Sequence, residues 1–386
     1  MIGHSVAEYI LIRTLIFLVR AVAPLSTAFT LVLPYLIYRF GHPVWLLFVG
    51  IWALAETIFL FLVFLPLKWR LLRDEHAGAP LTQERRELFN KCMTTLPHPE
   101  TFLRRWFLDS PAEDIKKENL NEFFAWALFN KALEAVDDED RDELNDYVRQ
   151  FEAQLGRRLE DGRGKAKSMR SSFDTISALH RPLVFYLLVW VLDVLSSLRL
   201  LFTGWRFYSQ PLSRIFRVFP PRPLGIIGSS RSSAKTITYW HHKGDKDTNL
   251  PILFIHGITL GLFPYLPFLD YLRKDDKGVS LEVIAIEIMP VSTRLCAGAA
   301  TVETMREEIS SILAAHGWDE FVLVGNSFGS GIAASLISDP NFSQRVKSLV
   351  LLDPVCFLLH LPDITYNFVR LRILAPHGLP NVTHTN

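Results

Sequence analysis

Cysteine is scarce in this chain, and neither sign of charge is in clear excess. The 3 cysteines among 386 residues, Cys92, Cys296 and Cys356, are too few and too far apart for a disulfide framework or a zinc site. Lys and Arg number 41 against 40 for Asp and Glu, and a net charge of +1 gives no general attraction for nucleic acid. Apolar residues make up 49%, which excludes a disordered chain. We expect no nucleic-acid partner, no cofactor and no metal site.

Long apolar runs predict attachment to a membrane. Residues 44–67 hold one charge, Glu56, and residues 21–38 hold none. About 20 apolar residues in a helix span the hydrocarbon core, so the two runs predict a transmembrane hairpin within residues 1–67. Basic residues flank both outer ends, which places both on the cytosolic side. We expect an integral protein of an intracellular membrane with lipids as partners, and a structural hydrogen bond of Glu56 within the hairpin.

A third apolar run, residues 183–202, is interrupted by Asp193 and Arg199. Both of its flanks are basic, so the distribution of charge gives no orientation. Crossing the membrane and lying on its surface remain equally open for this run. Residues 206–222 mix aromatic and basic side chains, which predicts an interfacial segment. Together these stretches define a third apolar or interfacial region, residues 182–222.

Residues 68–181 form a charged region with helical patterns. A capping box at residues 110–113, with proline at the first helical position, predicts a helix that runs to about Leu133. Four acidic residues at 137–140 predict the first turn of a second helix, because the helix dipole favours negative charge there. Gly156 is predicted to end this helix. The acids lack the spacing and the glycine of a calcium loop, so we interpret them as a solvated helix start.

Short apolar runs alternate with helical patterns in residues 236–386. Strands are predicted at residues 250–255, 281–289, 320–324 and 346–352. Helices are predicted between them, the clearest at residues 301–315. Strands that alternate with helices predict a parallel sheet and an α/β fold class.

One pattern in this region carries chemistry. The sequence from Gly325 to Gly329 reads G-N-S-F-G, with Ser327 at its centre. It lies between a predicted strand and a helix of small residues, where a nucleophilic serine would occupy a sharp turn with its hydroxyl above the sheet. Glycines on both sides let neighbouring backbone pass closely. The pattern therefore predicts a nucleophile elbow.

With this motif, residues 236–354 resemble the α/β-hydrolase superfamily of the lipase and esterase kind, and the whole chain resembles membrane-anchored hydrolases of fungi. Residues 250–257, which end in His256-Gly257, resemble the family's strand and oxyanion loop. The resemblance implies that Ser327 is the nucleophile and that the N–H groups of Ile258 and Phe328 form the oxyanion hole. It implies a structural role for His256, because the family's base follows the serine.

The resemblance is incomplete at the catalytic base. The family orders its triad as serine, acid, histidine. Asp353, at the end of the last predicted strand, is the candidate for the acid or only a cap of that strand, and 33 residues follow it. His360, His377 and His384 are the histidines after Ser327, and none lies in a recognisable strand-end loop. We therefore expect an α/β-hydrolase core truncated at its C-terminal end.

Two functions follow from this sequence. The first is a membrane-anchored serine hydrolase that cleaves lipid or other apolar acyl esters through Ser327. The second is a hydrolase-like membrane protein without an active triad, which binds or scaffolds. The sequence does not specify the acyl group or the oligomeric state.

Overall fold

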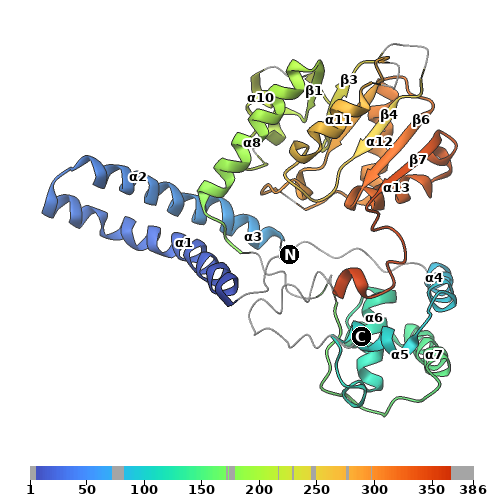
Figure 1. Cartoon of the computed structure of the whole chain (residues 1–386). Coiled ribbons are helices and arrows are strands. Elements are labelled where there is room, and N and C mark those ends of the chain that lie inside the picture. Colours follow the sequence, from blue (N-terminus) through green and yellow to red (C-terminus); the bar gives the residue numbers. More distant parts are fainter. Residues whose placement is uncertain are drawn as a thin grey trace. The chain divides into compact units, whose positions relative to one another are not determined.

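The computed structural model describes residues 6–71, 82–170, 173, 179–215, 217–227, 230–244, 249–274, 278–296 and 298–366. The chain forms two compact units (Figure 1). The first consists of Met1–Asp74 and Ser177–Cys356, and the second of Glu75–Ile176 and Phe357–Asn386. The hairpin thus groups with the sheet, and the residues from Phe357 onward group with the helical unit.

The first unit begins with a helical hairpin. Its segments are α1 (Val6–Phe40), α2 (Val44–Ile58), the π-helix η1 (Phe59–Phe64) and α3 (Leu65–Leu71). The helices α1 and α2 pack closely, since a Cβ added at Gly50 would lie 2.9 Å from a methyl group of Leu33. Most of their large apolar side chains are exposed. Three helices of the described residues are long and apolar enough to cross a membrane: Ala7–Phe40, Val44–Leu71 and Leu183–Phe202.

Glu56 does form a structural hydrogen bond, but to α8 (Leu183–Phe202) and not within the hairpin. Its side chain is fully buried and accepts a hydrogen bond of 2.8 Å from the N–H of Leu183, the first residue of α8. A carboxylate at a helix N-terminus satisfies a donor that has no partner inside the helix. Phe59 extends this contact, with its ring centroid 5.3 Å from that of Tyr186. The hairpin is thereby joined to the rest of its unit.

The remainder of this unit is built on a sheet of 7 strands in the order β2-β1-β3-β5-β4-β6-β7. The strands are β1 (Trp205–Ser209), β2 (Ser230–Arg231), β3 (Thr238–His242), β4 (Ile252–Ile255), β5 (Val283–Glu287), β6 (Phe321–Asn326) and β7 (Val346–Leu352). Only β3 runs antiparallel to both of its neighbours, β1 and β5. The other pairs are parallel, which confirms the predicted mostly parallel α/β fold.

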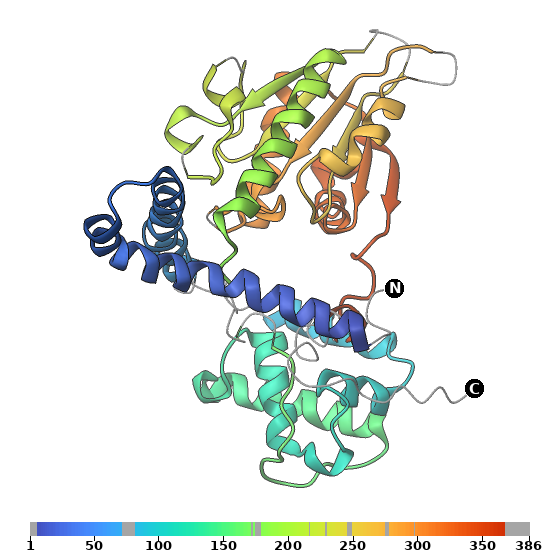
Figure 2. The same ribbon diagram turned by 60° about the vertical axis from the view of Figure 1, so that its left-hand side comes forward.

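Helices cover both faces of the sheet (Figure 2). One face packs on α12 (Val302–Ala315) and α13 (Phe328–Ile337), and the other on α8 and α11 (Leu266–Leu272). Each face has its own buried cluster because alternate residues of a strand point to opposite sides. Short helices complete the unit: α9 (Leu212–Ile215), α10 (Pro223–Ile227), η4 (Phe263–Tyr265), η5 (Met289–Val291) and α14 (Pro340–Ser343).

The second unit is helical and has a core rich in aromatic residues. Its elements are α4 (Thr82–Thr94), α5 (Pro99–Trp106), η2 (Ala112–Asp114), α6 (Lys117–Phe129), η3 (Leu133–Ala135) and α7 (Asp138–Leu155). Gly156 ends α7 in the left-handed conformation, as predicted. The helix predicted from residue 110 to Leu133 was wrong in extent, because Ile115 is extended between η2 and α6. Tyr366 is buried in this core and its hydroxyl donates to Asp109.

The interfacial segment predicted at residues 206–222 was partly wrong. Its first residues form β1, which pairs with β2 and β3 inside the sheet. Phe207 and Trp205 are buried there. Phe207, one of the aromatic residues that suggested a membrane interface, instead fills the core, and aromatic residues are common in strands for this reason.

A buried group of charges fixes α8 to the sheet. Asp193 lies 2.6 Å from an Arg222 nitrogen and 2.7 Å from an Arg294 nitrogen. Arg222 also pairs with Glu287, the last residue of β5. All four side chains are at least 90% buried, and the two carboxylates outweigh the effect of burial, so the pKa of Arg222 is raised. The polar residue that interrupts the third apolar run is therefore turned towards the protein.

Removing the charge of Asp193 is expected to destabilise the unit. Asp193→Asn would leave Arg294 without a carboxylate partner while buried, and such losses cost about 3–5 kcal/mol. Thermal denaturation of the purified chain measures the effect. The control is Asp270→Asn, because Asp270 pairs with the half-exposed Arg199 of α8, where an ion pair is worth about 0–1 kcal/mol. Equal melting temperatures for the two variants would contradict a stabilising role of the buried charges around Asp193.

Candidate functional site

Ser327 occupies the sharp turn that the G-N-S-F-G pattern predicts. The strand β6 ends at Asn326, α13 begins at Phe328, and Ser327 between them has φ 47° and ψ −116°. A positive φ is strained for a residue with a Cβ and costs on the order of 1–3 kcal/mol, so the surroundings must hold it. The Ser327 N–H donates a hydrogen bond of 2.9 Å to the Leu352 carbonyl. The Ser327 carbonyl accepts two hydrogen bonds from Ser330, one from its N–H and one from its hydroxyl.

Two glycines let neighbouring backbone close around this turn. A Cβ at Gly329 would lie 2.2 Å from the carbonyl oxygen of Ile255, the last residue of β4. A Cβ at Gly257 would lie 2.8 Å from the Cβ of Ser327. Gly325 is nearly as crowded, with the Gly329 carbonyl oxygen 2.9 Å from its added Cβ. The loop after β4 and the serine turn are therefore in direct contact, and only glycine fits at these positions.

The N–H groups predicted for an oxyanion hole come from these same two segments. Phe328 is the first residue of α13, so its N–H has no partner within the helix. Ile258 follows Gly257, and no backbone hydrogen bond of the described residues uses its N–H, whereas the next N–H, of Thr259, donates to Val291. Both predicted donors thus lie next to the contact between Gly257 and Ser327.

Tyr265 belongs to this site and was not found from the sequence. Its hydroxyl accepts a hydrogen bond of 3.2 Å from the Gly257 N–H and donates one of 2.6 Å to the Asn326 side chain. Burial and, to a smaller extent, the charge of Asp353 raise the pKa of this phenol, so it stays a donor at neutral pH. No pattern marks it in the sequence. Its position becomes visible only when η4 places it over the loop after β4.

His256 has both ring nitrogens engaged. Nε2 accepts a hydrogen bond of 3.0 Å from the Ile288 N–H, so Nδ1 carries the proton and donates to the Gly257 carbonyl at 2.6 Å. The side chain is fully buried, and burial lowers its pKa. A neutral, fixed ring of this kind orders the loop that contacts Ser327, in keeping with the structural role that the resemblance implied.

Asp353 lies one strand away from Ser327. It directly follows β7, whose Leu352 pairs with Asn326 of β6, and it has a positive φ of 46°. Its side chain is exposed. The structure therefore brings Ser327, Asp353 and the loop of Gly257 and Ile258 to the carboxyl edge of the same sheet.

No histidine hydrogen-bonds to Ser327 in the part of the chain that the structure describes. His360 belongs to the helical unit, where its Nε2 lies 3.1 Å from the Thr95 hydroxyl and its carbonyl accepts from Trp106. His377 and His384 lie outside the described residues. The geometry thus gives a serine and its surroundings, while the base stays a prediction.

Comparison with known families agrees with this geometry. Residues 205–376 match the family described as alpha/beta hydrolase fold. The sheet-bearing part of this chain is an α/β-hydrolase domain. The resemblance read from residues 236–354 is thereby confirmed, and the match begins earlier, at the first residue of β1.

The chain is also similar to several solved structures. A membrane phospholipase A described as a bacterial virulence factor shares 19% identity, with 45% of this chain and 47% of that chain covered and a TM-score of 0.30. A putative lipase from Acinetobacter baumannii shares 18%, with 42% and 45% covered and a TM-score of 0.28. The chain thus spans less than half the length of these two proteins. No curated protein matches it.

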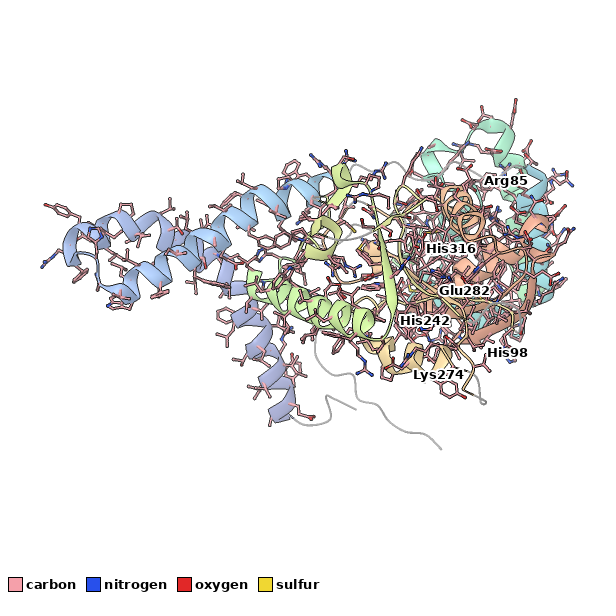
Figure 3. The ribbon with its side chains drawn as sticks, turned by 90° about the horizontal axis from the view of Figure 1, so that it is seen from above. Arg85, His98, His242, Lys274, Glu282 and His316 are labelled. Carbon is pink, nitrogen blue, oxygen red and sulfur yellow. The ribbon has the colours of Figure 1, made fainter. Side chains whose placement is uncertain are left out.

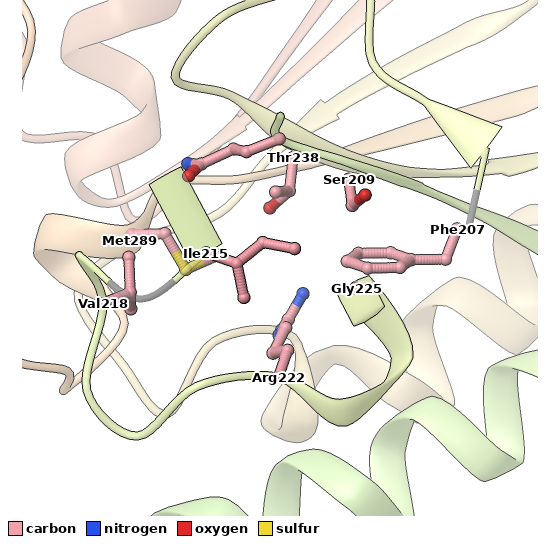
Figure 4. A pocket seen from close by; sticks show the side chains of 9 residues that line it. Phe207, Ser209, Ile215, Val218, Arg222, Gly225, Thr238 and Met289 are labelled. Atoms are coloured by element: carbon pink, nitrogen blue, oxygen red, sulfur yellow. The ribbon is translucent and has the colours of Figure 1, made fainter. Parts of the chain in front are cut away.

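Two pockets of the hydrolase domain lie beside β1, β3 and β5, at the same edge of the sheet as Ser327. One holds about 330 Å³ of empty space, and there the Arg222 guanidinium lies 5.1 Å from the centre of the Phe207 ring (Figure 4). The other holds about 770 Å³ and combines apolar walls such as Met289 with Arg214 and Arg217. Ser327 lines neither pocket, so neither one supports a choice of substrate.

Proposed function

We propose that this protein is a membrane-attached serine hydrolase that cleaves carboxylic esters of lipids or other apolar acyl groups. The observation that carries the proposal is the strained Ser327, at φ 47° between β6 and α13, with the loop of Gly257 against it. A serine held in this way has its hydroxyl free above the sheet. Inert serines at ordinary turns do not require this strain.

In the proposed reaction the Ser327 Oγ bonds to the ester carbonyl carbon. The N–H groups of Ile258 and Phe328 stabilise the negative charge on the carbonyl oxygen. The alcohol then leaves with a proton, and water hydrolyses the acyl-enzyme to the free acid and the serine. A base must take the serine proton first, and His360, His377 and His384 are the histidines that follow Ser327. Asp353 is the acid proposed to orient that base.

The membrane part of the proposal rests on exposed apolar helices. In α1, α2 and η1 large side chains such as Leu31, Phe48 and Leu62 are more than 70% exposed, a state that lipid tails would relieve. The helix α8 is different, because its buried side carries Asp193, Ser196 and Ser197. Its outward side is apolar and helically spaced: Val184, Leu187, Leu188, Val191, Leu195, Leu198 and Phe202. A helix with its polar side on the protein and its apolar side outward suits the membrane surface better than a span.

This arrangement of helices has a consequence for the membrane topology of the chain. If α1 and α2 cross the membrane and α8 lies on its surface, everything after α3 stays on the side where α1 begins. Arg13 and Arg20 before the first apolar run, and Lys68 and Arg70 after the second, favour the cytosolic side. The ester substrate would then reach Ser327 from the cytosolic leaflet or the cytosol.

Alkaline carbonate extraction distinguishes a surface α8 from a spanning one. The full chain is expected to stay in the membrane pellet, and a variant that begins at Trp69 is expected to be released, because a surface helix does not resist extraction. Adding Leu188→Asp and Leu195→Asp to that variant should also remove its binding to vesicles at neutral pH. Val302→Asp, an exposed apolar position on α12, is the matched control and should leave binding unchanged. A Trp69 variant that resists carbonate would show that α8 spans.

Covalent labelling tests the catalytic part. The purified chain in detergent is incubated with a fluorophosphonate probe and with p-nitrophenyl esters of short and long acyl chains. Reaction at Ser327 supports a serine hydrolase, and a preference for long acyl chains supports an apolar substrate. Labelling elsewhere in the chain would contradict the assignment of the nucleophile.

The second function is a hydrolase-like domain that binds or scaffolds without turnover. The observation in its favour is that His360, one of the three candidates for the base, makes its hydrogen bonds within the helical unit and not with Ser327. A chain that binds long-chain acyl groups but forms no covalent adduct at Ser327 would support this function over the first.

A further inference from the structure

A cluster of two histidines and a glutamate lies in the hydrolase domain, far along the sheet from Ser327. His241, Glu282 and His316 each place one ligand atom so that the three atoms lie within 4.8 Å of one another. His241 Nε2 is 2.8 Å from the Glu282 carboxylate. These residues are distant in the sequence and follow no spacing pattern, so the sequence had given no sign of a metal site.

The three residues come from different elements that meet at the amino edge of the sheet. His241 is in β3, Glu282 directly precedes β5, and His316 caps the C-terminal end of α12. Ser327 lies at the opposite, carboxyl edge, after β6. Glu282 and His316 are labelled in Figure 3, and their ligand atoms lie within 4.8 Å of each other. The cluster is therefore separate from the catalytic residues proposed above.

The histidines are suited to bind a cation rather than to carry a charge themselves. Their ring centroids are 4.2 Å apart, so protonation of both would bring two positive charges together. Two imidazole rings and one carboxylate are a donor set that divalent zinc prefers, and their ligand atoms converge within 4.8 Å.

The surroundings of the cluster also fit a metal site. The Tyr239 hydroxyl lies 3.1 Å from His316 Nε2, and the Tyr208 ring packs edge-on against the His316 ring at 5.4 Å. Contacts of this kind hold the orientation of a ligating ring. The Glu282 side chain is 26% exposed, so an ion has a route in from solvent.

We propose that His241, Glu282 and His316 bind a divalent transition metal of the zinc type, which ties β3 and the start of β5 to the end of α12. The two imidazoles each give one nitrogen, and the carboxylate gives one or two oxygens. At the amino edge of the sheet the ion would stabilise the domain and take no part in ester cleavage.

Cobalt and zinc binding to the full chain tests the proposal. The protein is purified without a histidine tag in detergent, stripped with a chelator and titrated with Co²⁺, whose visible absorption reports nitrogen and oxygen coordination, and then with Zn²⁺ in competition. One equivalent is expected to bind, and Zn²⁺ is expected to raise the melting temperature. His316→Gln and Glu282→Gln should each weaken binding by about tenfold or more and abolish the rise in melting temperature.

The matched control is His242→Gln. His242 is the next residue of β3, so its side chain points to the other face of the sheet, where its Nδ1 lies 3.1 Å from the Leu281 carbonyl. This variant should bind Co²⁺ as the unchanged chain does. Glu282→Gln keeps a hydrogen-bonding group beside His241, so this variant is expected to fold without metal. Its melting curve verifies that it is folded before metal is added. Absence of Co²⁺ absorption, or equal affinity in both ligand variants and the unchanged chain, would overturn the proposal.

Discussion

Ser327→Ala is expected to remove covalent labelling of this chain by a fluorophosphonate. The probe reacts with an activated serine oxygen, and Ser327 is the residue that the turn after β6 holds at φ 47° above the sheet. Loss of the attacking oxygen should reduce covalent labelling to background, together with any p-nitrophenyl ester turnover that passes through an acyl-enzyme. In-gel fluorescence and mass spectrometry of the labelled peptide measure this.

The control is Ser338→Ala, at the opposite end of α13. The Ser338 side chain is exposed and hydrogen-bonds to the Ala334 carbonyl within its own helix. Its loss should leave labelling unchanged. Labelling that persists in Ser327→Ala, or that disappears in Ser338→Ala as well, would remove the basis for the nucleophile assignment.

The rate of labelling in the unchanged chain carries separate information. A serine without a base is a poor nucleophile at neutral pH, and an oxyanion hole alone gives about 10³–10⁴-fold over water. Because no described histidine hydrogen-bonds to Ser327, we expect slow labelling. Fast labelling that is lost in His360→Ala, His377→Ala or His384→Ala would identify the base directly.

The elements next to the proposed site could be predicted because their signals are local. The strands β4, β6 and β7 are short apolar runs with clear turn residues after them, and α12 has its capping threonine, Thr301, in sequence. The elbow was predictable for the same reason, since the two glycines that flank Ser327 are needed within a span of five residues. The structure then shows why glycine is needed at position 329, because the carbonyl oxygen of Ile255 lies where a Cβ would be.

Long-range pairings could not be predicted from the same patterns. The strand β1 combines three aromatic residues with Arg206, a mixture that fits a membrane interface as well as a strand. Only its pairing with β3 distinguishes the two. Asp193 only marks α8 as interrupted; its partners Arg222 and Arg294 come from distant loops. The contacts of Tyr265 with the serine turn, and the meeting of His241, Glu282 and His316, likewise arise only once the sheet has assembled.

Gly329→Val is expected to unfold the hydrolase domain. Its added Cβ would lie 2.2 Å from the carbonyl oxygen of Ile255, the last residue of β4, and 3.0 Å from that of His256, the next residue, and both are backbone atoms. Neither can move without separating α13 from β4, so the loss in the free energy of unfolding should be about 5 kcal/mol or more. Thermal denaturation and the yield of folded protein measure the effect.

Gly331→Ala, two residues further along α13, isolates the clash from the change of residue type. Nothing lies within 4 Å of a Cβ added at Gly331, so this substitution meets open space. Alanine in place of an unstrained helical glycine is expected to stabilise by about 0.4–1 kcal/mol, because it restricts the unfolded chain. The two variants should therefore shift the melting temperature in opposite directions. A Gly329→Val protein that melts like the unchanged chain would show that α13 does not lie against β4, and the strained turn at Ser327 would lose its support.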